Sequence, residues 1–87
     1  MLEIAIRVYG ANAQIDVAVE EMAELTQALV KAKRYATDKD FDRFRDNVIE
    51  EIADVEIMLD QLRIIFDIDE ALIEDVKEFK TDRLAKP

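Results

Sequence analysis

The fold is decided by residues 48–66, which read VIEEIADVEIMLDQLRIIF. Apolar residues recur along this stretch at gaps of three and four, the spacing of one face of an α-helix. They are Val48, Ile52, Val55, Leu59, Leu62 and Phe66. A second apolar set, Ile57, Met58 and Ile65, lies toward the opposite side. Because a helix that is apolar on two sides is covered by neighbours on both, the stretch predicts a bundle that a second subunit completes.

The same helical spacing occurs upstream, from about residue 11 to residue 34. The apolar residues that follow it are Ile15, Ala18, Met22, Leu25, Leu29 and Ala32. A short apolar stretch at residues 2–9 predicts one or two further helical turns that end at Gly10.

Short breaks separate the predicted helices. Residues 35–40 lose the apolar pattern and offer Thr37 or Asp38 as the N-cap of a helix that we expect from about residue 41 to 66. After a second break, a last helix is expected from about residue 70 to 85. We therefore predict an all-α, antiparallel helical bundle, built from a single domain of residues 1–87 and completed as a homodimer or homotetramer.

Composition narrows the possible chemistry. The chain has 87 residues with no Cys and no His, which excludes disulfides, thiolate nucleophiles and a Ser-His-Asp triad. Its net charge of -9 argues against a nucleic-acid partner, although bound divalent cations would still allow a phosphate substrate. No apolar run approaches the roughly 20 residues that span a bilayer, and the N-terminus does not resemble a secretory signal. We therefore expect a cytoplasmic protein with no membrane partner.

An acidic hexapeptide occurs twice. Residues 20–25 read EEMAEL and residues 50–55 read EEIADV. Both copies lie in predicted helices, and consecutive helices joined by a short turn usually pack antiparallel, so the copies can face each other. Since residues three apart are neighbours on a helix, each copy supplies one carboxylate pair. The pairs are Glu21 with Glu24 and Glu51 with Asp54.

Crowded carboxylates need compensation. Each like-charge pair costs about 0.2–0.5 kcal/mol on an exposed helix, and partial burial raises that cost. Mg2+ or Mn2+, which prefer hard oxygen ligands, would supply the compensation, and the small residues Ala23 and Ala53 are expected to leave room for an ion. A ferritin-like di-iron site is disfavoured because it needs His. The other explanation of the pattern is the ordinary solvated helix faces of an acidic protein.

The paired motifs resemble those of the MazG-like, all-α nucleotide pyrophosphohydrolases, especially the short single-domain phage and bacterial forms. The family pattern is Glu-Glu-x-x-Glu on one helix and Glu-x-x-Asp on the next, which matches residues 20–24 and 51–54. Residues 9–10, 14–16 and 80–84 are also similar to the flanks of the family. The resemblance covers the chain from about residue 9 to residue 84.

The resemblance implies a helical bundle, a dimer or dimer of dimers, and hydrolysis of a (deoxy)nucleoside triphosphate to the monophosphate and pyrophosphate. The magnesium ligands that it implies are Glu21, Glu24, Glu51 and Asp54. The chain departs from the family at Tyr9, where relatives often have Trp, so the preferred base can differ.

Four other polar residues are candidates for catalysis and substrate binding. In the absence of His, Glu20 or a ligand such as Glu21 would accept the proton of the attacking water. Lys80 and Arg83 lie three apart on the last helix and would contact the phosphates, unless they only complement the helix dipole. Gln14 would read a base edge, or it lies at a subunit contact.

A non-catalytic helical assembly module is the other function that the sequence allows. Such a module explains the apolar stripes equally well, but it does not explain why both acidic copies have the same order. The sequence does not identify the base or sugar of a nucleotide substrate, its biological role, or the number of metal ions.

Overall fold

The computed structural model describes residues 10–35, 39 and 41–85, and these residues form three α-helices without any strand. The helices are α2 (Ala11–Tyr35), α3 (Phe41–Ile65) and α4 (Glu70–Ala85). The all-α prediction and the predicted helix limits are confirmed to within about one residue. The helical turns expected at residues 2–9 lie outside the described residues.

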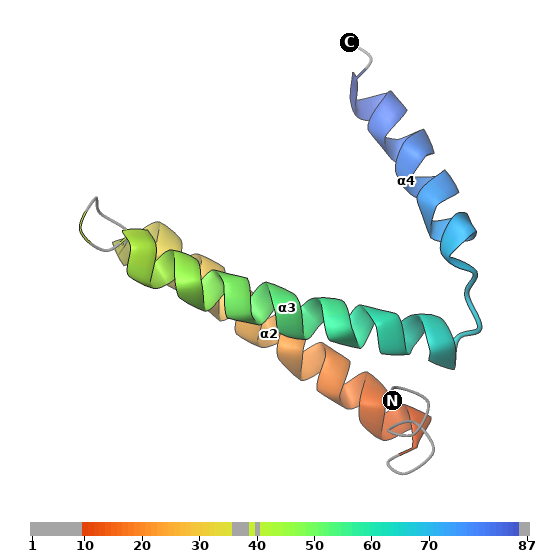
Figure 1. Cartoon of the computed structure of the whole chain (residues 1–87), viewed down its shortest axis with the longest axis horizontal. Helices are drawn as coiled ribbons and strands as arrows, with labels where there is room; N and C mark the ends of the chain where they lie inside the picture. Colours follow the sequence, from red (N-terminus) through yellow and green to blue (C-terminus); the bar gives the residue numbers. More distant parts are fainter. Residues whose placement is uncertain (1–9, 36–38, 40, 86–87) are drawn as a thin grey trace.

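Helices α2 and α3 form an antiparallel hairpin and make the extensive helix–helix contact of this part of the chain (Figure 1). The apolar side chains buried among the described residues are few and mostly small: Ala18, Ala28 and Met58. Small side chains let two helix backbones approach closely, because little volume separates them. The hairpin core is therefore narrow.

The apolar stripes predicted from the sequence are wider than the contact between α2 and α3. Ala18 is buried and Leu25 is half-buried on α2, as the stripe predicted. Other members of the two stripes are exposed, and they include Met22, Leu29, Ile52, Leu59 and Phe66. A single neighbouring helix covers only part of a broad stripe, so the outer edge of each stripe remains on the surface.

The turn between α3 and α4 has a defined geometry. The Ile68 N–H donates to the Arg63 carbonyl at 2.8 Å, and Asp67 adopts a left-handed φ of 52°. This is the hydrogen-bonding pattern by which many helices end. The Asp69 carboxylate then accepts a hydrogen bond from the Ala71 N–H at 2.9 Å and caps α4.

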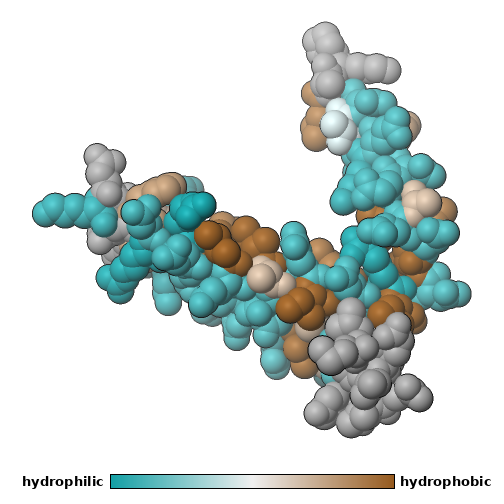
Figure 2. Space-filling model, viewed as in Figure 1, coloured by the Kyte–Doolittle hydropathy of each residue, from teal (hydrophilic) through white to brown (hydrophobic). Residues whose placement is uncertain are grey.

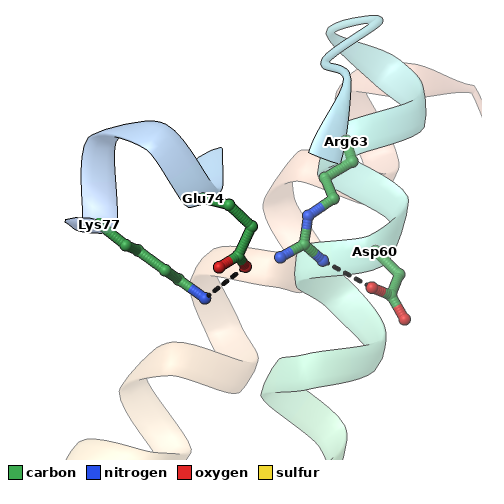
Figure 3. Close-up of polar contacts among 4 residues, drawn as sticks. All are labelled: Asp60, Arg63, Glu74 and Lys77. Atoms are coloured by element: carbon green, nitrogen blue, oxygen red, sulfur yellow. Dashed lines mark hydrogen bonds and ion pairs between the residues drawn. The ribbon is translucent and has the colours of Figure 1, made fainter. Parts of the chain in front are cut away.

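Helix α4 leads away from the hairpin (Figure 1). Its apolar residues Leu72, Val76 and Phe79 are all more than half exposed. Two ion pairs lie near the junction, Asp60–Arg63 at 2.6 Å and Glu74–Lys77 at 3.3 Å (Figure 3). Each pair lies within one helix, so neither fastens α4 to α3.

In the part of the chain that the structure describes, no helix combines the length and the apolar character that crossing a membrane requires.

Packing at the hairpin contact is testable with one small residue. Ala18 is 1% exposed, so Ala18→Leu would overpack the contact and lower the free energy of unfolding by about 1–3 kcal/mol. Ala23→Leu is the matched control, because Ala23 is exposed on the same helix. Urea unfolding followed by circular dichroism measures both. Equal stability of the two variants would contradict the observed packing.

Candidate metal centre

Three carboxylates from the two hairpin helices meet halfway along the hairpin. One oxygen each from Glu21 and Glu24 of α2 and Glu51 of α3 lies within 4.8 Å of the others. Glu21 and Glu24 are three residues apart and share one side of α2, while the antiparallel course of α3 brings Glu51 opposite them. The prediction that the two acidic copies face each other is confirmed.

The arrangement is least favourable for the charged forms of Glu21 and Glu51. Both side chains are half-buried, whereas Glu24 is exposed. Burial raises the pKa of both carboxyl groups above the usual 4.5, and repulsion by Glu24 and then by Asp54 raises each pKa further. The fold thus holds two carboxylates where their charged forms are poorly solvated and face other negative charges.

Asp54 lies beside this group of three. Its charge acts on both Glu21 and Glu51, although its own side chain is exposed. The sequence assigned Ile57 and Met58, which lie three and four residues after Asp54, to a second covered side of this helix. Met58 and Gln61 are buried, but Asp54 and Ile57 are not, because no helix of the described chain covers that part of α3.

The expectation that Ala23 and Ala53 leave room for an ion between the helices is wrong. Both residues are exposed and point away from the hairpin contact. The small residues that lie between α2 and α3 are Ala18 and Ala28, which are buried. The repeat therefore has its alanines on the outer side of each helix, and the close approach of the helices depends on other positions.

Two oxygens of the cluster have no hydrogen-bond partner. Glu21 Oε2 and Glu51 Oε2 are both buried from solvent and unpaired. A carboxylate oxygen that is shielded from solvent and unpaired is unfavourable, and a bound cation, a water molecule or a proton shared with Glu24 would relieve it. Oxygen donors of this kind suit Mg2+ or Mn2+, and the residues present therefore fit a hard divalent cation.

The remaining predicted residues occupy different places. Glu20 is exposed beside Glu21, and Gln14 is buried two helical turns before it. Lys80 and Arg83 are exposed near the end of α4, and the Arg83 guanidinium lies 5.8 Å from the centre of the Phe79 ring. Because α4 leads away from the hairpin, one chain does not bring these two cations to the acidic cluster (Figure 1). Tyr9 lies outside the described residues.

Gln61 is a residue that the sequence reasoning did not single out. Its side chain is only 6% exposed and its Oε1 has no hydrogen-bond partner. Gln61 follows Asp54 by seven residues, as Gln14 precedes Glu21 by seven, so each amide lies about two turns from the acids on its own helix. The available signal was helical spacing, because Gln61 lies three residues after Met58 and four before Ile65.

Comparison of the chain with models of protein families, with curated proteins and with solved structures finds no match. The chemistry of the centre is therefore argued from the residues that form it.

Charge crowding at the centre predicts a pH-dependent effect of Glu21→Gln. A carboxyl group whose pKa rises on folding favours folding below its usual pKa of 4.5 and opposes folding once the pH exceeds the raised pKa. In chelator-treated buffer at about pH 7, Glu21→Gln should therefore raise the urea midpoint, and the gain should vanish as the pH falls to about 4.

Glu20→Gln is the control for this experiment, because Glu20 is the exposed neighbour and its substitution changes the net charge equally. If Glu21→Gln raises the urea midpoint at neutral pH no more than Glu20→Gln does, the crowding of carboxylates does not destabilise the fold.

Proposed function

We propose that this chain is a Mg2+-dependent hydrolase that splits a (deoxy)nucleoside triphosphate into the monophosphate and pyrophosphate. The observation that carries the proposal is the meeting of Glu21, Glu24 and Glu51, with two buried oxygens that lack a partner. The spacing of these residues is that of the MazG-like family, and membership of that family is part of the proposal. Mn2+ would suit the same oxygen donors.

Each acidic residue has a part in the proposed site. Glu21 and Glu51 supply the half-buried oxygens from the two helices, while Glu24 and Asp54 supply exposed oxygens at the open side. Bound Mg2+ would neutralise the triphosphate and lower the pKa of a water molecule. Because Glu24 and Asp54 are exposed, a substrate can approach from their side of the hairpin.

A carboxylate accepts the proton of the attacking water in the proposed reaction, since the chain has no His. Water attacks the α-phosphorus, the bond from that phosphorus to the bridging oxygen breaks, and pyrophosphate leaves with the bond electrons. Glu20 or Glu21 accepts the proton of the water. Without a bound cation, burial and neighbouring charge raise the pKa of Glu21, and a bound cation would lower that pKa again.

Substrate contacts by Lys80, Arg83 and Gln14 belong to the same proposal. Gln14 lies on the helix that carries Glu21, about two turns away, and its side chain is buried. Lys80 and Arg83 lie on α4, which leads away from the acids of its own chain (Figure 1). Their contact with the phosphates therefore requires a homodimer or homotetramer in which α4 of one chain reaches another.

A non-catalytic assembly module is the second candidate function. The exposed apolar residues of α2 and α3, among them Val19, Met22, Ile49 and Ile52, favour it, because such surfaces mark interaction sites. This candidate gives no reason for the unpaired oxygens of Glu21 and Glu51. A response of the protein to Mg2+ separates the two functions.

Binding of Mg2+ should stabilise the folded chain. At about five times its dissociation constant, Mg2+ should raise the melting temperature by about 5 °C, because it binds the folded cluster and not the unfolded chain. Glu21→Gln and Asp54→Asn should lose this rise. Glu56→Gln, which removes an exposed carboxylate elsewhere on α3, should keep it. A wild-type melting temperature that ignores Mg2+ would remove the basis for a metal centre.

Turnover is tested by measuring pyrophosphate release from a panel of ribo- and deoxynucleoside triphosphates with Mg2+. Glu51→Gln should lower the rate at least about 100-fold while the circular dichroism spectrum stays unchanged, since the change keeps the shape of the side chain and removes a ligand charge. Glu56→Gln is again the control. Absence of pyrophosphate from every nucleotide would refute the enzyme proposal, and a loss of helicity in Glu51→Gln would indicate a structural role.

A further inference from the structure

Two of the five side chains that are buried in the described part of the chain are amides. Gln14 of α2 is 7% exposed and Gln61 of α3 is 6% exposed, while the other three are Ala18, Ala28 and Met58. The Gln61 Oε1 atom is buried and has no hydrogen-bond partner. Since a buried polar group without a partner is unfavourable, two amides in so small a core need a physical reason.

The two amides lie level with each other across the hairpin. Glu21 and Glu24 of α2 lie opposite Glu51 of α3. Gln14 precedes Glu24 by ten residues and Gln61 follows Glu51 by ten, so the antiparallel course of the helices places both about 15 Å from the acids, toward the same end of the hairpin. At this level each amide has the other as its buried polar neighbour.

The apolar contacts do not fix the stagger, which is the position of α2 relative to α3 along the hairpin. Apolar residues recur at gaps of three and four on both helices, so a slide of one helical turn again places apolar residues against apolar residues. Apolar side chains also gather along the side of α3 that looks toward the angle with α4 (Figure 2). A surface of this kind favours contact between helices without selecting one stagger.

The connection between the helices does not fix the stagger either. Residues 36–40 join α2 to α3. Five residues can span up to about 17 Å, whereas the axes of packed helices lie about 8–10 Å apart. A slide of one turn, about 5.4 Å, would lengthen the required span to only about 11 Å. The connection therefore reaches in either stagger.

Repulsion among the carboxylates opposes the observed stagger. Oxygens of Glu21, Glu24 and Glu51 lie within 4.8 Å of one another. A slide of one turn in either direction would carry Glu51 away from the other two and relieve the repulsion between the helices. In the absence of a cation, some other interaction must therefore favour the stagger that brings the three glutamates together.

We propose that Gln14 and Gln61 select this stagger and are positioning residues for the acidic cluster. The unpaired Gln61 Oε1 is the acceptor that the Gln14 amide meets when the two residues are level. A slide of one turn would instead bring Gln14 level with Met58 or Ile65, which lie three residues before and four after Gln61, and would leave both amides without a partner. Buried polar residues fix the register of packed helices in coiled coils by the same physics.

Substitution of the amides should show that they act as a pair. Gln14→Leu and Gln61→Leu each leave one amide buried without its neighbour, so each should lower the urea midpoint. The double variant should unfold at or above the wild-type midpoint, because it leaves no unpaired amide. Gln27→Leu is the control, since Gln27 is an exposed glutamine on α2. A loss in the double variant that equals the two single losses combined would overturn the proposal.

Distances between spin labels measure the stagger directly. The chain has no Cys, so Asp16→Cys and Arg45→Cys place one label on each helix at exposed positions without changing the net charge. The labelled wild type and Gln27→Leu should each give a single narrow distance. The double leucine variant should add a second distance that differs by up to about 5 Å, the rise of one turn. An excess of unlabelled chains of the same variant restricts the measurement to labels within one chain.

A single unchanged distance in the double leucine variant would overturn the proposal, because the stagger would then be fixed without the amides. Failure of that variant to fold, seen by circular dichroism, would also overturn it, since two leucines in place of the amides are expected to pack. Both measurements are made without Mg2+ and without nucleotide. Their outcome therefore does not depend on the chemistry proposed for the acids.

Discussion

Repulsion among the carboxylates at the centre of the hairpin is the constraint on which the rest of the structure depends. Glu21 and Glu51 are drawn together by the apolar residues that flank them, because the stripes that pack α2 on α3 run directly beside the acids. The hydrophobic contact and the charge repulsion therefore oppose each other at the same place. A narrow core with few buried apolar side chains contributes little stabilisation to offset such repulsion.

The repeat divides the hairpin into two faces with different chemistry. Within six residues, each copy turns an acid toward the partner helix, an acid toward one face and an apolar side chain toward the other. Because α2 and α3 run antiparallel, equivalent residues of the two copies lie on the same side of the hairpin. Charged residues therefore gather on one side and apolar residues on the other.

Local periodicity explains which parts of this structure the sequence predicts. Helix positions and the meeting of Glu21 with Glu51 follow from spacing and from one short connection, so both were predicted. The burial of individual residues depends on which neighbour covers each side of a helix, and spacing alone does not determine it. For this reason Ala23 was wrongly placed inside the contact. The course of α4 depends on the left-handed conformation of Asp67, which has no signal in the helical pattern.

Charge also constrains how a nucleotide would reach the proposed site. The chain carries a net charge of -9, and the acidic face concentrates part of it around Glu24 and Asp54. A free triphosphate is repelled by such a surface, whereas its complex with a divalent cation carries less negative charge. Burial and mutual repulsion raise the pKa of the Glu21 and Glu51 carboxyl groups, and a bound cation would offset both effects. In the proposed reaction, cation binding therefore precedes or accompanies nucleotide binding, because each partner reduces the repulsion that opposes the other.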